Sequence, residues 1–312
     1  MLRQVLDLLE VLDDPRASGA AVAGLFRARG AREVAVETVS GERGKTDFVK
    51  VVIPGARGKR AGGPAPTLGV IGRLGGVGAR PAEIGYVSDG DGATASLAAA
   101  LKLTDMARRG DVLPGDVIVT THVCPDAPVT PHEPVPFMGS PVDMATMNRL
   151  EVDPSMDAVL SIDTTKGNRV INRRGIAISP TVCRGWILRV SEDLLDVLQR
   201  VTGRLPVVLP LTMQDITPYG NGVYHLNSIL QPATATAAPV VGVAVTTEVP
   251  VAGSATGASH AVDLELATRY AVEVAKGFGA GRLRFHDPDE LGRLVRLYGE
   301  MRHLQTAGRA GG

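Results

Sequence analysis

The chain has 312 residues, of which 44% are hydrophobic and 4% are aromatic. Such a chain can bury a large core, so we expect one sizeable α/β domain or two smaller ones, not a disordered protein. Lys plus Arg and Asp plus Glu both number 33, so the formal net charge is zero. No overall field attracts nucleic acid or an anionic membrane, and a small molecule or peptide is the expected partner.

The cysteine content and the N-terminus indicate a cytoplasmic location. Cys124 and Cys183 are too few for a disulfide framework, and MLRQVLDLLEVLDD is an amphipathic pattern interrupted by acids, unlike a signal peptide. No apolar run approaches the roughly 20 residues that span a bilayer.

Predicted helices and strands alternate along the chain. In order they are helices at 2–12 and 20–29, a hairpin at 33–39 and 47–54, strand 67–72, helix 93–109, strand 116–121, helix 142–150, strand 157–162, the helix SEDLLDVLQRV after Ser191, the strand LPVVLPL, strand 238–245, the helix VDLELATRYAVEVAKGF, and a final helix after Asp287.

This alternation predicts a three-layer α/β sandwich with a mixed, mostly parallel sheet and helices on both faces. Residues 1–312 are expected to form a single domain without a large lid domain. Residues 124–142 are expected to be an irregular loop near the site, and residues 306–312 a disordered tail.

The segment VSDGDGATASLAAALK places Asp89 and Asp91 between an apolar strand and an alanine-rich helix. Tight-turn chemistry alone explains an SDGDG sequence, and for this segment in isolation it is the better interpretation. The functional interpretation gains weight because Asp126, Asp163 and His260 also follow apolar strands. Carboxylates and an imidazole at strand ends are ligands that suit zinc, manganese or cobalt. The number of bound ions is left open as one, two or none.

Two further groups lie near this predicted metal shell. His122 ends the strand GDVIVTTH and is a candidate ligand or a buried histidine. Glu133, in the proline-flanked PHEPVPFMG, is a candidate general base; the prolines exclude a helical HExxH arrangement. Asp91 is the alternative catalytic carboxylate.

Substrate-binding candidates lie in two glycine-containing segments. In GRLGGVGARP, which lacks a phosphate-loop signature, Arg73 or Arg80 could clamp a carboxylate. In TPYGNGVYH, Tyr219, Asn221 and His225 could bind a carbonyl or an amine, although a structural turn is the simpler interpretation.

Taken in order, these segments resemble the co-catalytic zinc peptidase superfamily, especially glutamyl and deblocking aminopeptidases and, more distantly, aminoacylases. SDGDGATASLAAALK resembles the strand and helix of the bridging aspartate, here Asp89. GDVIVTTHVCPD resembles the strand of the paired glutamates, DAVLSIDTT the strand of the second-metal aspartate, here Asp163, and GSATGASH places the last ligand at His260.

The chain departs from that pattern at two positions. Arg73 stands where the first histidine ligand is expected and would repel a cation, and Pro125-Asp126 stands where the glutamate pair is expected. The chain is closer to a widespread bacterial family of unknown function than to any characterised peptidase.

The resemblance implies a metal-dependent hydrolase of a small amide or peptide bond that uses metal-activated water, and a homo-oligomer. One alternative is a non-catalytic, metabolite-binding or oligomeric relative with a degenerate metal site. A second is a single-metal amidase or lyase that acts on a non-peptide substrate.

Overall fold

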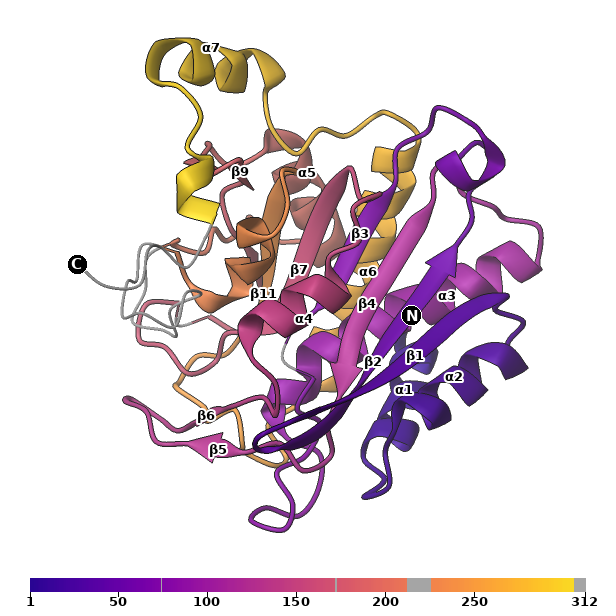
Figure 1. Ribbon diagram of the computed structural model, residues 1–312, viewed down its shortest axis with the longest axis vertical. Helices are drawn as coiled ribbons and strands as arrows, with labels where there is room; N and C mark the ends of the chain where they lie inside the picture. Colours follow the sequence, from indigo (N-terminus) through magenta and orange to yellow (C-terminus); the bar gives the residue numbers. More distant parts are fainter. Residues whose placement is uncertain (74, 172, 212–225, 306–312) are drawn as a thin grey trace.

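The computed structural model describes residues 1–73, 75–171, 173–211 and 226–305. They form a nine-stranded sheet with helices on both faces and a separate two-stranded ribbon (Figure 1). No helix in these ranges has the length and apolar character that crossing a membrane requires.

Four parallel strands form the centre of the large sheet. They are, in spatial order, β4 (Val117–Val123), β3 (Leu68–Gly72), β7 (Ala158–Thr164) and β11 (Val240–Thr246). Parallel strands buried on both sides need apolar residues on both faces, and these four are buried along nearly their whole length.

Antiparallel strands flank this centre. The hairpin β1 (Glu33–Gly41) and β2 (Gly44–Ile53) joins the edge of β4, while β8 (Gly175–Ile178) and β9 (Val182–Cys183) pair with β11, and β10 (Trp186–Ile187) pairs with β9. The sheet is therefore mixed and mostly parallel at its centre, as predicted.

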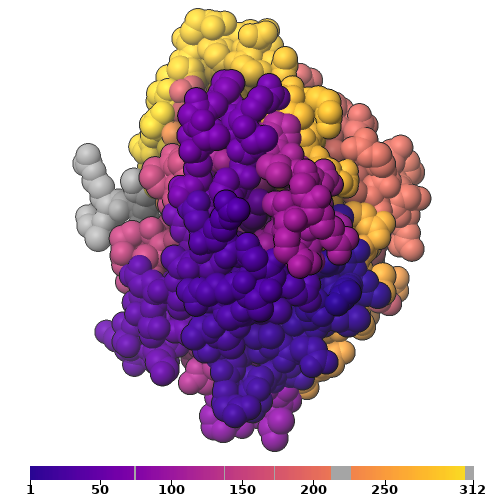
Figure 2. Space-filling model, turned by 90° about the vertical axis from the view of Figure 1, so that its right-hand side faces the viewer, coloured from indigo at the N-terminus to yellow at the C-terminus, as the bar shows by residue number. Residues whose placement is uncertain are grey.

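The helices form two unequal layers. One face carries α1 (Leu2–Leu12), α2 (Gly19–Ala28), α3 (Asp91–Arg108), α5 (Glu192–Thr202) and α6 (Ala261–Gly279). The other face carries α4 (Met144–Glu151) and the 3-10 helix η3 (Ser228–Thr234), and α7 (Pro288–Tyr298) packs near β9 and β10 (Figure 1). The N-terminal third covers much of the surface seen in Figure 2, and the C-terminal segment rises above it.

Alternate residues of the central strands contribute their side chains to two separate hydrophobic cores. Val70, Val119 and Leu160 belong to the large core beneath α3 and α6, whereas Ile71 and Val159 belong to the smaller core on the opposite face. The period of two in an extended chain produces this division.

Most of the predicted elements are present, with caps where they were expected. Ser191 and Asp287 cap α5 and α7 through their side chains. The expected strand LPVVLPL is wrong: its only pairing with a described residue is a single bridge from Val208 to Ile178, since two prolines remove the N–H groups that a ladder needs. Residues 124–142 contain the short ribbon of β5 (Val129–Thr130) and β6 (Phe137–Met138) instead of being wholly irregular.

The start of α3 approaches the ends of β3 and β7 very closely. A Cβ at Gly92 would lie 2.5 Å from the Ile162 carbonyl oxygen and 2.7 Å from that of Arg73. Only glycine fits there, so this residue allows the helix to begin directly above the sheet.

We expect Gly92→Ala to lower the free energy of unfolding by about 1–3 kcal/mol, because the added methyl group must displace backbone. Gly24→Ala, where nothing lies within 4 Å of the added Cβ, is the control, and helix propensity predicts a gain of about 0.5–1 kcal/mol. Urea unfolding measures both. An unchanged midpoint for Gly92→Ala would contradict the close approach.

Candidate functional site

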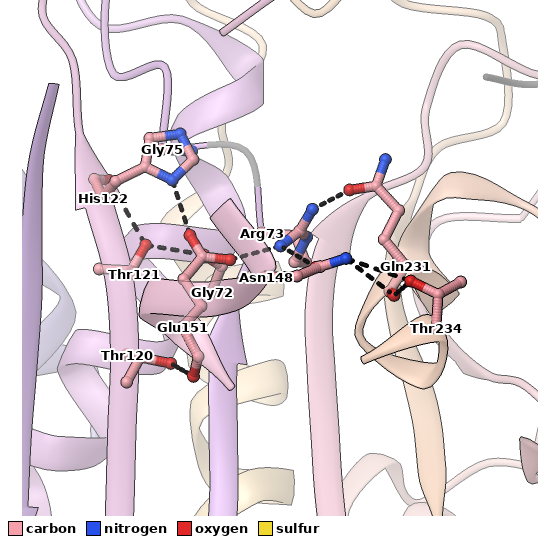
Figure 3. A network of polar contacts seen from close by, with 10 residues as sticks. All are labelled: Gly72, Arg73, Gly75, Thr120, Thr121, His122, Asn148, Glu151, Gln231 and Thr234. Carbon is pink, nitrogen blue, oxygen red and sulfur yellow. Dashed lines mark hydrogen bonds and ion pairs between the residues drawn. The ribbon is translucent and has the colours of Figure 1, made fainter. Parts of the chain in front are cut away.

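The carboxyl ends of β4, β3, β7 and β11 meet at one edge of the sheet, and two polar clusters lie there. The first, the Glu151 network, joins β3 and β4 to α4 and η3 (Figure 3). The second, the Asp91 cluster, joins the start of α3 to the segment after β7 and the segment before α6. Open α/β sheets bind their ligands at this edge.

The Glu151 carboxylate lies between two partners. Its Oε2 forms an ion pair with Nη1 of Arg73, and its Oε1 lies 2.7 Å from Nδ1 of His122 (Figure 3). All three side chains are at most 2% exposed. The network is therefore sealed from solvent.

Hydrogen bonding fixes the tautomer of His122. The backbone N–H of Gly75 donates to Nε2 at 3.1 Å, so this nitrogen carries no proton and Nδ1 donates to Glu151. Both ring nitrogens are engaged, and neither is directed to an open ligand position.

The other side of Arg73 is held by amides. Its Nη2 donates to Oε1 of Gln231, and its Nη1 lies 3.4 Å from Oδ1 of Asn148. Asn148 in turn donates to the hydroxyl of Thr234 at 3.2 Å. These contacts join α4 and η3 around one buried guanidinium (Figure 3).

The electrostatics of the network favour an ionised Glu151. Burial raises the pKa of this carboxyl, but the Arg73 guanidinium and the His122 hydrogen bond outweigh burial, and the pKa lies below its usual value. The buried negative charge of Glu151 is therefore balanced by the buried positive charge of Arg73.

In the second cluster, a buried carboxylate binds a buried ammonium group and a hydroxyl. Lys166 Nζ forms an ion pair with Oδ2 of Asp91 and donates to the Ala258 carbonyl at 2.9 Å. The Ser259 hydroxyl donates to Oδ1 of Asp91. Lys166 and Asp91 are at most 1% exposed, whereas Ser259 and its neighbour His260 are half-buried.

Burial raises the pKa of Asp91 above its ordinary value, and the Lys166 ion pair, the Ser259 hydrogen bond and the nearby His260 only partly offset that effect. A carboxyl group with a raised pKa beside a hydroxyl is suited to accept and return a proton. Asp91 and His260, predicted separately as base and ligand, are therefore neighbours.

Sequence reasoning missed Lys166 and Ser259. Lys166 lies two residues after the end of β7, in SIDTTKGN. A lysine buried at a strand end needs a carboxylate partner, and this requirement was the signal that could have linked it to Asp89 or Asp91. Ser259 carried no comparable signal in its Gly/Ser/Thr segment.

Asp89 and Asp163 are buried at adjacent places on this edge. They are 3% and 1% exposed, and the neighbouring hydroxyls of Ser88 and Thr164 lie 3.4 Å apart. The backbone N–H of Asp89 donates to the Gly253 carbonyl at 3.0 Å.

The remaining predicted residues are dispersed. Asp126 and Glu133 are exposed, and Asp126 accepts a hydrogen bond from the buried Cys124, whose pKa is raised by burial to about 12. Arg80 donates to the Asp13 carbonyl at 2.9 Å. Arg73, expected to bind substrate, has a side chain that is 0% exposed and contacts Glu151 and Gln231. Tyr219, Asn221 and His225 lie outside the described residues.

The described side chains do not fit a metal ion. They include no group of three or more His, Cys, Asp or Glu residues with a suitable arrangement. The first expected ligand position is occupied by a buried cation, and His122 is engaged through both nitrogens.

A family model described as "Protein of unknown function (DUF1177)" matches residues 37–308. The chain belongs to this family. No curated protein matches the sequence.

Two crystal structures of LapA from Legionella pneumophila, one titled an aminopeptidase, are similar to this DUF1177 chain at 9% identity. The alignments cover 88% of this chain and 70% and 71% of the LapA chains, with TM-scores of 0.49 and 0.46.

We expect Glu151→Gln to destabilise the protein by about 3–5 kcal/mol, because it leaves Arg73 as a buried cation without a countercharge. The exposed Glu10→Gln on α1 is the matched control and should change stability by less than about 0.5 kcal/mol. Urea unfolding at neutral pH measures both.

The pH dependence gives a second readout of the same variant. Because the folded pKa of Glu151 is lowered, its ionisation adds stability above the ordinary value of 4.5, and that stability is lost as the pH falls through the lowered pKa. The Gln variant should lack this part of the acid loss. Equal stability of Glu151→Gln and wild type across the whole pH range would contradict the buried pair.

Proposed function

We propose that this protein hydrolyses an amide or peptide bond in a small substrate, with Ser259 as nucleophile and Asp91 as the acid–base group. The observation that carries the proposal is the hydrogen bond from the half-buried Ser259 hydroxyl to the fully buried Asp91 carboxylate. A nucleophilic hydroxyl needs an adjacent base, and this pair supplies both at the edge of the sheet where ligands bind.

In the first step, Ser259 Oγ attacks the substrate carbonyl carbon and its proton passes to Asp91 Oδ1. The tetrahedral intermediate then collapses, the C–N bond breaks, and Asp91 returns the proton to the leaving amine. A water molecule attacks the resulting acyl ester, with Asp91 again accepting the proton. The C–O bond to Ser259 then breaks and Asp91 returns the proton to Oγ, which releases the acid and restores Ser259.

Lys166 positions the base in this scheme. Its ammonium group is held by the Ala258 carbonyl as well as by Asp91, so it fixes the carboxylate beside the segment that carries Ser259. The ammonium charge also opposes part of the rise in the Asp91 pKa that burial causes.

A metal-dependent hydrolase is the second candidate, favoured by the two buried carboxylates of Asp89 and Asp163 on neighbouring elements. Zinc, manganese or cobalt would need these two carboxylates and His260 to converge. We assign no step to a metal, because the described side chains do not form such a group.

A non-catalytic relative that binds a metabolite is the third candidate, favoured by the sealed network at Arg73. A buried ion pair in place of a ligand is what a chain that had lost a metal-dependent activity would retain. The three candidates differ in their response to loss of Ser259 and to removal of metal.

The test is a screen of small amides, dipeptides and cyclic imides with wild type and three variants. Ser259→Ala should lower kcat/KM by about a thousandfold or more, and Asp91→Asn by about a hundredfold or more, because nucleophile and base are lost. Ser254→Ala, in the same segment, is the matched control and should keep wild-type activity.

Two conditions separate the candidates. Activity should survive a chelator and should fall at acid pH, as Asp91 is protonated, with a midpoint above the ordinary 3.8. Activity that needs added zinc and survives Ser259→Ala would support the metal candidate. Hydrolysis of no substrate would support the binding candidate. Either result would overturn the proposal.

A further inference from the structure

A cavity of about 440 Å³ lies between the end of α5, the start of β8 and the first turns of α6. Three arginines, Arg173, Arg174 and Arg204, line it together with a single acid, Asp263. Cavities of this size accommodate small organic ligands.

The charges of the lining residues are not balanced. Arg174 is paired with Asp263 through its Nε at 2.9 Å. Arg173 and Arg204 form no ion pair with any residue in the described ranges, so the lining carries two uncompensated positive charges. A cation would be repelled here and an anion attracted.

The rest of the lining is apolar and partly open. Ile176 and Leu198 are buried, at 5% and 1% exposure. Leu205 and Val262 are 77% and 60% exposed. An apolar ligand body that covered them would remove this surface from water.

We propose that this cavity binds a small organic carboxylate with an apolar body, as in a medium-chain acyl carboxylate or an N-acylated apolar amino acid. Arg173 and Arg204 bind the carboxylate, since the planar guanidinium fork matches its two oxygens. Leu205 and Val262 cover the apolar body. An inorganic anion would use only the charged half of the lining.

The cavity adjoins the Asp91 cluster along the chain. Val262 and Asp263 belong to the first turn of α6 and follow Ser259 and His260 directly. The binding claim does not depend on hydrolysis, because neither arginine contacts Ser259 or Asp91 in the hydrogen bonds and ion pairs of the described residues.

The test is isothermal titration calorimetry with four probes: octanoate, N-acetyl-leucine, octylammonium and inorganic phosphate. Octanoate or N-acetyl-leucine, or both, should bind saturably, and comparing them distinguishes an acyl chain from an acylated amino acid. Octylammonium should not bind, and phosphate should bind at least about tenfold more weakly, because it gains nothing from the apolar wall.

Substitutions at the cavity supply the second readout. Arg173→Gln and Arg204→Gln should each weaken binding of the carboxylate about tenfold, and Leu205→Ser should weaken octanoate binding while leaving phosphate unaffected. Arg296→Gln, an exposed arginine on α7, is the control for loss of one charge and should bind as wild type does. Thermal unfolding of each variant checks that it is folded.

The binding measurements either support the carboxylate site or overturn it. Loss of carboxylate binding in Arg173→Gln and Arg204→Gln, with Arg296→Gln unaffected, supports the site. No binding of either carboxylate, equal binding of octylammonium, or unchanged affinity in both cavity variants overturns it.

Discussion

The ion pair between Glu151 and Arg73 constrains this edge of the sheet, because it joins a helix to the end of a strand. Glu151 is the last residue of α4, and Arg73 follows the last residue of β3, so one carboxylate fixes the helix to the strand end. Because both groups are removed from water, each is tolerated only while the other is present. The same carboxylate orients His122 on the neighbouring strand, and amides from η3 hold the far side of the guanidinium.

The Glu151 network limits the chemistry that side chains at this edge of the sheet can perform. Both ring nitrogens of His122 are engaged in hydrogen bonds. The buried guanidinium of Arg73 occupies the position where the first metal ligand was expected. The proton transfer that we propose is assigned instead to Asp91, whose pKa is raised by burial and which stands at the start of α3 beside Ser259. The two clusters lie at the same end of the sheet but differ in function: the Glu151 network is sealed, and the Asp91 cluster reaches half-exposed side chains.

The sequence predicted the architecture well, because the signals for it are local. Apolar runs, glycine stops and capping residues such as Ser191 and Asp287 specify helices and strands within a few residues of themselves. The exception, LPVVLPL, shows that an apolar run is not a strand when prolines remove its donors.

The site was less predictable, because its contacts are distant along the chain. Glu151 and Arg73 are separated by 78 residues, and Lys166 and Asp91 by 75. In the sequence, Glu151 is an ordinary acid at the end of a short helix, and nothing nearby marks it as the partner of a buried arginine. That Arg73 stands where the resemblance implies a ligand was visible, and so was the expectation that it would repel a cation. The partner that makes such an arginine tolerable was not.

The buried carboxylate of Glu151 holds His122 in a single tautomer that is closed to a ligand. Nitrogen-15 NMR of the histidine side chains measures this directly, with His122→Gln used to assign the signals. We expect a protonated Nδ1 and an unprotonated Nε2, both unchanged when zinc is added in excess. A protonated Nε2, or a shift of the Nε2 signal on addition of zinc, would contradict it.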